Sequence, residues 1–406
     1  MDTTTGFHPR SGETWRDPYP MYRWLRDEDP LHHVPTGDYW VLSRHEDVFD
    51  AARDTTTFSS AQGLTYLYDD VAAAGVDEAM PMVFLDPPEH TDFRRLVAKG
   101  FTPRQVAEIE PGVRRFVRER LDRMAEMGTC DVVAELLKPL PTYVVAHYLG
   151  VPEADRGRFD GWVHRIVAAS ALGDPLGASD TVGEVFTYFT DLIERRRTDP
   201  GDDTVSLLVA ASDRAVADGT ATDGAAVDPM RILGFAFTMI TGGNDTTTGL
   251  LGVGLDLLQG TPGAVATLTQ RPELIDDAVS ELLRLTAPVQ GLARTTTVDV
   301  ERHGATIPAG RKVLLLYASA NRDERRFGDD ADVVRIERRA QQVLTFSYGA
   351  HHCLGAAAAR LMARVVLDEL LARFPRFTVD AARGTFAPGH FVRWYDSLPF
   401  DTGEVS

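Results

Sequence analysis

The residues best suited to chemistry lie in the run Phe346-Ser347-Tyr348-Gly349-Ala350-His351-His352-Cys353-Leu354-Gly355. The stretch that follows, Ala356 to Leu361, is strongly helix-forming, so Cys353 is expected at or next to a helix N-terminus. The helix dipole and free backbone N–H groups at such a position favour a thiolate over a thiol. Gly349 and Gly355 are expected to let the backbone turn tightly and pass close to a flat ligand. The run therefore predicts a thiolate presented to a bound group.

Three interpretations of Cys353 follow from the residues alone. A free cysteine in a reducing compartment is usually a buried structural residue. A zinc site built from His351, His352 and Cys353 is disfavoured, because three consecutive loop residues do not easily point at one tetrahedral ion. The four alanines after Gly355 leave room for a large planar ligand, and an electron-rich thiolate suits a haem iron that cleaves O–O bonds. Haem binding is the interpretation that explains most of the run.

A second feature is a predicted helix that breaks helix rules in its middle. It starts at Asp228-Pro229 and contains Gly242-Gly243-Asn244-Asp245-Thr246-Thr247, where two glycines cost about 1 kcal/mol each relative to alanine. Such conflicts usually mark a functional site. The Thr246 hydroxyl can reach the Gly242 carbonyl and open the helix, leaving space for a diatomic ligand beside Asp245 as a proton source. The alternative interpretation is a glycine kink for helix packing.

Two further patterns involve charged residues. Glu281 and Arg284 stand at i,i+3 on a helix delimited by Pro272 and Pro288, a spacing that permits an ion pair but is common on surfaces. Basic residues that could hold carboxylates through charge-assisted hydrogen bonds are His90 and Arg94, at i,i+4, together with Arg294 and His351.

Taken together, these motifs resemble those of the cytochrome P450 family. The resemblance rests on Phe346-x-x-Gly349-x-His351-x-Cys353-x-Gly355 and on Gly242-Gly243-Asn244-Asp245-Thr246-Thr247, and it extends from about Pro87 to Gly355. Ser347 stands where many members have glycine, and Asn244 where His or Ala is frequent. The resemblance implies haem b (iron protoporphyrin IX) as cofactor and Cys353 as its metal ligand. The other cofactor-binding positions that it implies are His90, Arg94, Gly242, Gly243, Arg294, Phe346, His351 and Gly355.

The same resemblance implies an activity. Asp245 and Thr246 would be the catalytic pair that delivers protons to oxygen, and Glu281, Arg284 and Arg338 a structural triad beneath the haem. The protein would be a monooxygenase that acts on a small, apolar or aromatic molecule with O₂. Electrons would come from a ferredoxin and its reductase, because no Gly-x-Gly-x-x-Gly follows a strand. A peroxygenase that uses H₂O₂ and a non-catalytic haem-binding or recruitment protein are the alternatives.

The substrate pocket is expected to be lined by apolar segments from several parts of the chain. They are Leu64 to Tyr68, Met80 to Phe84, Ile166 to Leu172, Phe237 to Thr241, Val289, Gln290, Leu292, Phe391 and Val392.

Composition bounds the remaining possibilities. The 406 residues are 44% hydrophobic and 25% charged, and the formal net charge of −18 argues against nucleic acid as a partner. Cys130 and Cys353 are the only cysteines, which fits a reducing cytoplasm. No apolar run reaches the roughly 18 residues of a membrane span. We expect a cytoplasmic, monomeric protein without a membrane anchor.

The elements that must position these residues are mainly helical. Periodicity predicts helices over Val113 to Met127, Thr181 to Arg197, Met230 to Gln259, Leu274 to Leu285 and Ala356 to Arg373. Strands are predicted at Tyr39 to Leu42 and within Thr295 to Leu316, and loops at Thr198 to Asp203 and Asp213 to Asp228. Proline at positions 103, 111, 152, 229, 272 and 288 is expected to mark helix boundaries. The pattern predicts one α+β domain over residues 1–406, mainly helical, with β-rich portions at about 30–60 and 290–320 and in the C-terminal segment.

Overall fold

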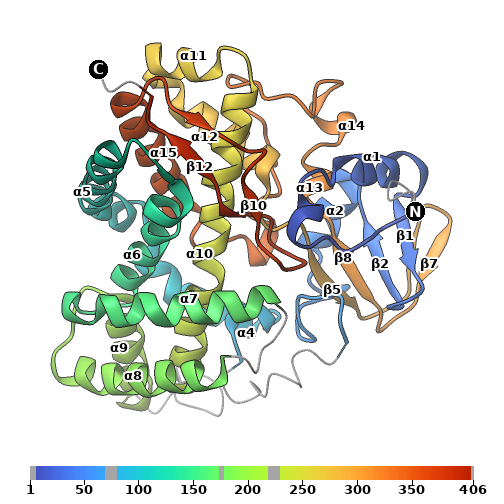
Figure 1. The fold of residues 1–406 in the computed structure, drawn as a ribbon. Helices are drawn as coiled ribbons and strands as arrows, with labels where there is room; N and C mark the ends of the chain where they lie inside the picture. The colour runs from blue at the N-terminus through green and yellow to red at the C-terminus, as the bar shows by residue number, and fades with distance from the viewer. Residues whose placement is uncertain (1–5, 69–79, 173–177, 218–228, 404–406) are drawn as a thin grey trace.

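The computed structural model describes residues 6–68, 80–172, 178–217 and 229–403. Figure 1 shows a helical body and a sheet-bearing lobe beside it, with α10 (Pro229–Gly260) running through the middle of the body. The mainly helical α+β class predicted from the sequence is confirmed.

The helices make up most of the structure. The other helices of the body are α4 (Glu89–Val97), α5 (Pro103–Met127), α6 (Pro139–Tyr148), α7 (Arg156–Leu172), α8 (Ser179–Thr198), α9 (Thr204–Ala217), α11 (Ala264–Gln270), α12 (Ile275–Thr286) and α15 (Ala356–Arg373). The shorter helices beside the sheet are α1 (Tyr19–Glu28), α2 (His45–Arg53), α13 (Tyr317–Ala320) and α14 (Glu324–Phe327).

The main sheet has five strands in the order β1-β2-β8-β5-β3. Strands β2 and β8 pair in parallel, with Val41 opposite Leu314, and the other pairs are antiparallel. Its strands are β1 (Leu31–Val34), β2 (Tyr39–Leu42), β3 (Phe58–Ser59), β5 (Leu292–Thr296) and β8 (Lys312–Leu315). The remaining strands form small sheets: β4 (Thr129–Asp131), β6 (Val300–Arg302), β7 (Ala305–Ile307), β9 (Thr378–Val379), β10 (Thr385–Phe386), β11 (Tyr395–Ser397) and β12 (Pro399–Asp401).

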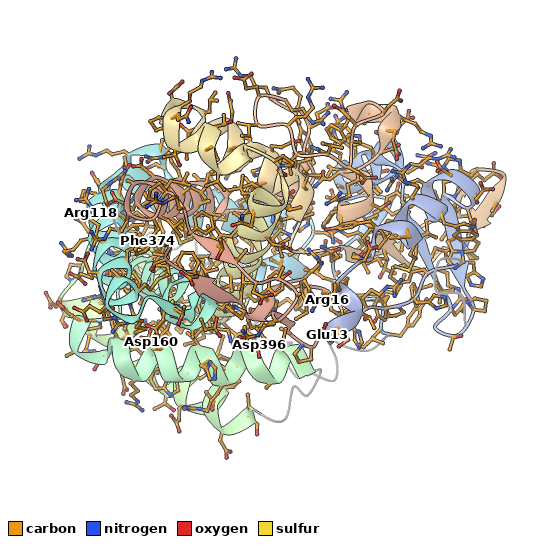
Figure 2. All side chains as sticks on the ribbon, turned by 45° about the horizontal axis from the view of Figure 1, so that its top comes forward. Glu13, Arg16, Arg118, Asp160, Phe374 and Asp396 are labelled. Atoms are coloured by element: carbon orange, nitrogen blue, oxygen red, sulfur yellow. The ribbon has the colours of Figure 1, made fainter. Side chains whose placement is uncertain are left out.

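The C-terminal strands are joined to the N-terminus of the chain by side-chain contacts. Arg16, labelled in Figure 2 beside its ion-pair partner Glu13 at 2.7 Å, also donates to the carbonyls of Ala381 and Gly384 at 2.8 Å each. Trp15, which is 2% exposed, donates its indole N–H to the Gly389 carbonyl. The C-terminal segment is thereby held across the body, where it approaches the middle of α10.

Most predicted elements are confirmed to within a few residues. The helix predicted over Ala356 to Arg373 has those bounds, and the one predicted over Met230 to Gln259 is one residue longer at each end. Asp228, the expected cap of that helix, lies outside the described residues.

Two predictions of element boundaries are wrong. Pro111 lies inside α5 rather than at its edge, although an interior proline costs about 3 kcal/mol. The buried face of α5 outweighs that cost, because Val106, Val113 and Leu121 lie in the core and the helix packs along α15. The predicted loop from Asp213 is helical as far as Ala217, the end of α9, and residues 218–228 lie outside the described part.

Candidate functional site

Cys353 lies three residues before the first residue of α15. Its backbone N–H donates to the Phe346 carbonyl at 2.9 Å, which closes the loop on itself, and the backbone N–H groups of Gly355 and Ala356 are directed at its sulfur. The side chain is exposed, whereas that of Cys130 is only partly so. The prediction that Cys353 stands at a helix N-terminus is confirmed.

The expectation that this position alone favours the thiolate is wrong for the free thiol. Burial raises the pKa of Cys353, and the N–H groups of Gly355 and Ala356 and the nearby Arg94 only partly offset that effect. The side chain has an open side, yet the protein around it removes more of the thiolate's solvation than the helix N-terminus compensates. A coordinated metal deprotonates a thiol outright, so the geometry still suits a metal ligand.

Glycine is required in this loop for reasons other than the predicted approach to a flat ligand. Gly349 has φ +72°, and an added Cβ there would lie 3.1 Å from the Ala52 carbonyl oxygen, so Gly349 allows close approach to α2 rather than to a flat ligand. Gly355 has ordinary backbone dihedrals, and an added Cβ there would meet Sγ of Cys353 at 4.0 Å. Ser347 has φ +56°, which explains why glycine suits this position.

The middle of α10 carries the second part of the site. The Thr246 hydroxyl donates to the Gly242 carbonyl at 2.9 Å, as predicted, yet α10 continues without a break. A Cβ on Gly242 would meet nothing within 4 Å, whereas one on Gly243 would lie 2.9 Å from Cγ2 of Val145 on α6. Open space therefore adjoins Gly242, while Gly243 serves the packing of α10 against α6.

Asp245 follows in the same segment. Its Oδ1 is buried without a hydrogen-bond partner, and the carboxylate forms no ion pair with any residue that the structure describes. Burial raises the pKa of Asp245 to about 7, and the backbone N–H groups of Thr246 and Asp245 only partly oppose it. A carboxyl with such a pKa both holds and releases a proton near neutral pH.

The predicted basic residues meet next to the cysteine loop. The rings of His90 on α4 and His351 are 4.2 Å apart, His351 Nε2 lies 3.2 Å from Oγ of Ser60, and Arg94 donates to the His352 carbonyl. Arg294 on β5 is 2% exposed and uses Nη1 for the Ala293 carbonyl. His90, Arg94, His351 and Arg294 are thus brought together from three separate segments.

The two histidines of this cluster are neutral rather than cationic. Burial, with the charge of Arg94, lowers the pKa of His90 to about 4. Burial, with Arg294, His90 and Arg94, lowers that of His351 to about 3. Nδ1 of His90 is buried without a partner. The cluster therefore offers two guanidinium charges and two neutral imidazoles that donate N–H groups.

This donor set fits a haem. The carboxylates of a haem would accept hydrogen bonds from the guanidinium and imidazole donors, including the unpartnered Nδ1 of His90. The iron of a haem would be bound by the accessible sulfur of Cys353. The open space at Gly242 would accommodate a small ligand. Among the described residues, no group of three or more His, Cys, Asp or Glu could hold a bare metal ion.

The predicted triad beneath the site forms a buried network. Arg284 and Glu281 are 0% and 1% exposed and bond twice, at 2.7 and 2.9 Å, and Arg338 adds a third contact to Glu281 at 3.0 Å. Arg284 also donates to the carbonyls of Asn321 and Ala331 at 2.8 and 2.6 Å. The network joins α12 to the segment that leads into the cysteine loop.

Several residues predicted to line the substrate pocket are buried in other contacts. Gln290 is 2% exposed and turned away, because it bonds the Tyr22 hydroxyl and the Ala287 carbonyl. Met82 and Ile166 belong to the core, and Tyr66 stacks on Tyr39. The side chains of residues 167, 168 and 170–172 lie outside the described part. The predicted lining residues that stay partly accessible include Leu64, Val83, Phe84, Phe237, Thr241, Val289, Leu292, Phe391 and Val392.

Sequence reasoning missed two residues that contact the site. Ser60 reaches His351 through its hydroxyl, and Thr142 on α6 bonds Asn244 on α10 at 2.8 Å. Ser60 stands far from His351 in the sequence, and Thr142 has no motif around it. In the sequence, the one indication of the Thr142 contact was Asn244, which stands where His or Ala is frequent in the cytochrome P450 family.

Comparisons with known proteins agree with this geometry. The "Cytochrome P450" family model matches residues 262–383. The chain is 56% identical over 400 residues to cytochrome P450 130 of Mycobacterium tuberculosis, with 97% of each protein covered. It is 35% identical over 412 residues to the vitamin D(3) 25-hydroxylase of Pseudonocardia autotrophica, with 100% of this chain and 99% of the relative covered.

A solved structure shares the same fold. CYP109E1 of Bacillus megaterium in complex with testosterone superposes with a TM-score of 0.83 at 29% identity, covering 95% of this chain and 99% of that one. In the described part of the present structure, no helix has the length and apolarity needed to cross a bilayer. The fold, the cysteine loop and these relatives together show that the chain belongs to the cytochrome P450 family of haem-iron monooxygenases.

Proposed function

We propose that this protein inserts one oxygen atom from O₂ into a small, uncharged, apolar or aromatic molecule. The observation that carries the proposal is the accessible sulfur of Cys353, held by backbone N–H groups before α15 and next to the cluster of His90, Arg94, Arg294 and His351. We assign the cofactor as haem b. When bound, the haem iron supplies oxygen activation, and the chain supplies ligation, orientation and protons.

In this proposal, Cys353 is the metal ligand and Phe346 and Gly355 shape the loop around it. Phe346 packs against the Arg360 guanidinium, which lies 5.6 Å from the ring centroid. The two arginines and the two imidazole N–H donors would hold the two carboxylates of the haem. Gly242 leaves the space that O₂ requires, and Gly243 keeps the adjacent backbone close to α6.

Asp245 and Thr246 form the proposed proton route. The carboxyl of Asp245, with a pKa of about 7, exchanges protons with solvent near neutral pH. The Thr246 hydroxyl donates to Gly242 at rest and can turn toward the open space beside that glycine. Asp245 and Thr246 are consecutive residues of α10, so both groups stand on the same turn of the helix as Gly242.

Replacing Thr246 by Ala is expected to leave electron consumption near normal and to divert reduced oxygen to H₂O₂. Helix stability gives no reason for damage, since Ala is a better helix former than Thr. NAD(P)H consumed, peroxide formed and product formed are measured with a surrogate ferredoxin and reductase. Thr247→Val is the matched control, because Thr247 makes the same kind of bond, to Gly243, on the packed side of the helix. Unchanged coupling in Thr246→Ala would remove Thr246 from the route.

Replacing Arg294 or His90 by Leu is expected to weaken haem retention without unfolding the protein. Each change removes one hydrogen bond to a carboxylate, worth about 1.5–3 kcal/mol when the bond is charge-assisted. The haem-to-protein ratio after gel filtration is the measurement, and Arg302→Leu on the exposed strand β6 is the control. Full haem occupancy in the Arg294, His90 double variant would contradict the assignment.

The proposed substrate class rests on the accessible lining. The polar side chains among the accessible predicted lining residues are Thr65, Tyr68, Thr238 and Thr241, and the others are hydrocarbon or aromatic. The hydroxyls of Tyr68, Thr238 and Thr241 donate to backbone carbonyls, those of Asp38, Gly234 and Phe237. A charged substrate would lose its solvation there without a partner. One relative is named for vitamin D(3), and CYP109E1 was crystallised with testosterone. We therefore favour a rigid, largely apolar substrate of comparable character.

We further propose that electrons come from a ferredoxin and its reductase. Two arginines form a patch of positive charge beside the cysteine loop of an otherwise acidic protein: Arg94 donates to the His352 carbonyl, and the exposed Arg360 lies 5.6 Å from the ring centroid of Phe346. Such a patch steers an acidic partner. We also propose that the protein works as a cytoplasmic monomer whose 406 residues form one domain.

Isotopic labelling tests the reaction. A substrate is first selected as a compound that shifts the spin state of the haem iron when it binds. Product formed from it under isotopically labelled O₂ should carry one labelled oxygen atom. Unlabelled product, or product formed only when H₂O₂ is added, would replace the proposal by a peroxygenase.

A further inference from the structure

Asn244 stands between Gly243 and the Asp245-Thr246 pair, and its side chain uses both of its ends. It is 5% exposed, its Oδ1 accepts from the Thr142 hydroxyl of α6 at 2.8 Å, and its Nδ2 donates to the Ile240 carbonyl at 2.6 Å. Thr142 is itself 7% exposed. A buried polar bridge thus joins α10 to α6 next to the proposed proton route.

The stretch of α10 around this bridge has a low intrinsic helix stability and relies on contacts with neighbouring elements. Side chains of one region repeatedly donate to the carbonyl four residues earlier, and such bonds compete with the backbone ladder and bend helices. The pairs are Thr238 with Gly234, Thr241 with Phe237, Asn244 with Ile240, Thr246 with Gly242, Thr247 with Gly243, and Thr248 with Asn244. The two glycines lower the helix preference further.

Contacts with α6 and the segment before it lie on one side of this stretch. Besides the Asn244 bridge, the Thr248 hydroxyl donates to the Leu137 carbonyl at 3.1 Å, and Gly243 lies against Val145. Gly242, in contrast, adjoins open space, and Thr246 stands one turn after it. Because this stretch of α10 has a low intrinsic helix preference, the contacts with α6 determine the orientation of Gly242 and Thr246 toward the open space.

We propose that Asn244 and Thr142 are positioning residues, whose hydrogen bond fixes the rotation of α10 and thereby the placement of Gly242 and the Thr246 hydroxyl. The inference rests on the proposed function, since it concerns the same oxygen site. The two substitutions separate the hydrogen bond from simple packing. Leucine has the branching and heavy-atom count of asparagine, and valine those of threonine, yet neither leucine nor valine forms the bond.

The test uses CO as a probe of the oxygen site, because CO binds a reduced haem where O₂ would and its infrared stretching band responds to neighbouring groups. Asn244→Leu, Thr142→Val and the double variant are compared with the wild-type holoprotein. Thr269→Val on α11 is the control, since Thr269 is exposed and only bonds the Val265 carbonyl. Should Asn244→Leu fail to fold, Thr142→Val, which keeps the side-chain shape, carries the test alone.

The C–O band is expected to shift or split in Asn244→Leu and in Thr142→Val. The double variant should show a change similar to that of each single variant, and the control should keep the wild-type band. Equal shifts in the single and double variants would identify one shared hydrogen bond. A wild-type protein with a thiolate-haem CO spectrum, together with unchanged C–O bands in both single variants, would overturn the inference alone. A wild-type protein without that spectrum would overturn the proposed function, and this inference with it.

Discussion

Replacing Cys353 by Ala is expected to abolish the red-shifted CO spectrum and all O₂-dependent product formation. Cys353 presents an accessible sulfur with two backbone N–H groups directed at it, beside the His90 and His351 pair. Alanine removes the thiolate and leaves no group in that place that can donate electron density to iron. The spectrum of the reduced protein under CO and the turnover with labelled O₂ are the measurements.

Cys130→Ala is the matched control for this variant. Cys130 lies on β4, and burial, with the nearby carboxylates of Glu135 and Asp131, raises its pKa to about 11. It is therefore a protonated, structural residue, and its loss should leave the CO spectrum unchanged. A red-shifted band retained by Cys353→Ala, or lost in Cys130→Ala, would contradict the site assignment.

Arg284→Met is expected to cost the largest share of stability among single changes, about 3–5 kcal/mol. The guanidinium is fully buried and neutralises Glu281, which would keep only Arg338 as a charged partner. The carbonyls of Asn321 and Ala331 would lose a donor as well. Denaturant unfolding of the haem-free and haem-loaded proteins measures the loss.

Arg104→Met provides the comparison with an exposed pair of similar spacing. Arg104 bonds Glu108 at 2.8 Å on the surface of α5, where ion pairs contribute about 0–1 kcal/mol. Equal effects of the two substitutions would mean that the Glu281-Arg284 network does not support the fold.

The helical class and the helix over Ala356 to Arg373 could be predicted because local periodicity encodes them. The Glu281-Arg284-Arg338 network was implied by the resemblance to the cytochrome P450 family, because spacing alone permits only the Glu281-Arg284 pair. The hydrogen bond from Thr246 to Gly242 was predictable for the same reason, because i,i+4 neighbours meet on any helix. Pro111 was misjudged because long-range packing of α5 against α15 outweighs a local penalty.

Other features depended on tertiary surroundings that spacing does not reveal. The net effect on Cys353 could not be predicted, because burial competes with the helix terminus and the balance depends on neighbouring segments. Gly243 and Gly242 are adjacent and identical in type, yet only the fold shows that one meets Val145 and the other open space. The neutral state of His90 and His351 likewise follows from their burial beside Arg94 and Arg294.

The measurement that tests the central claim most directly is the absorption spectrum of the purified wild-type protein, reduced and exposed to CO. A thiolate from Cys353 bound to haem iron predicts a strongly red-shifted Soret band that disappears in Cys353→Ala. A Soret band at the position typical of histidine-ligated haem, or no haem absorption after reconstitution, would contradict the account.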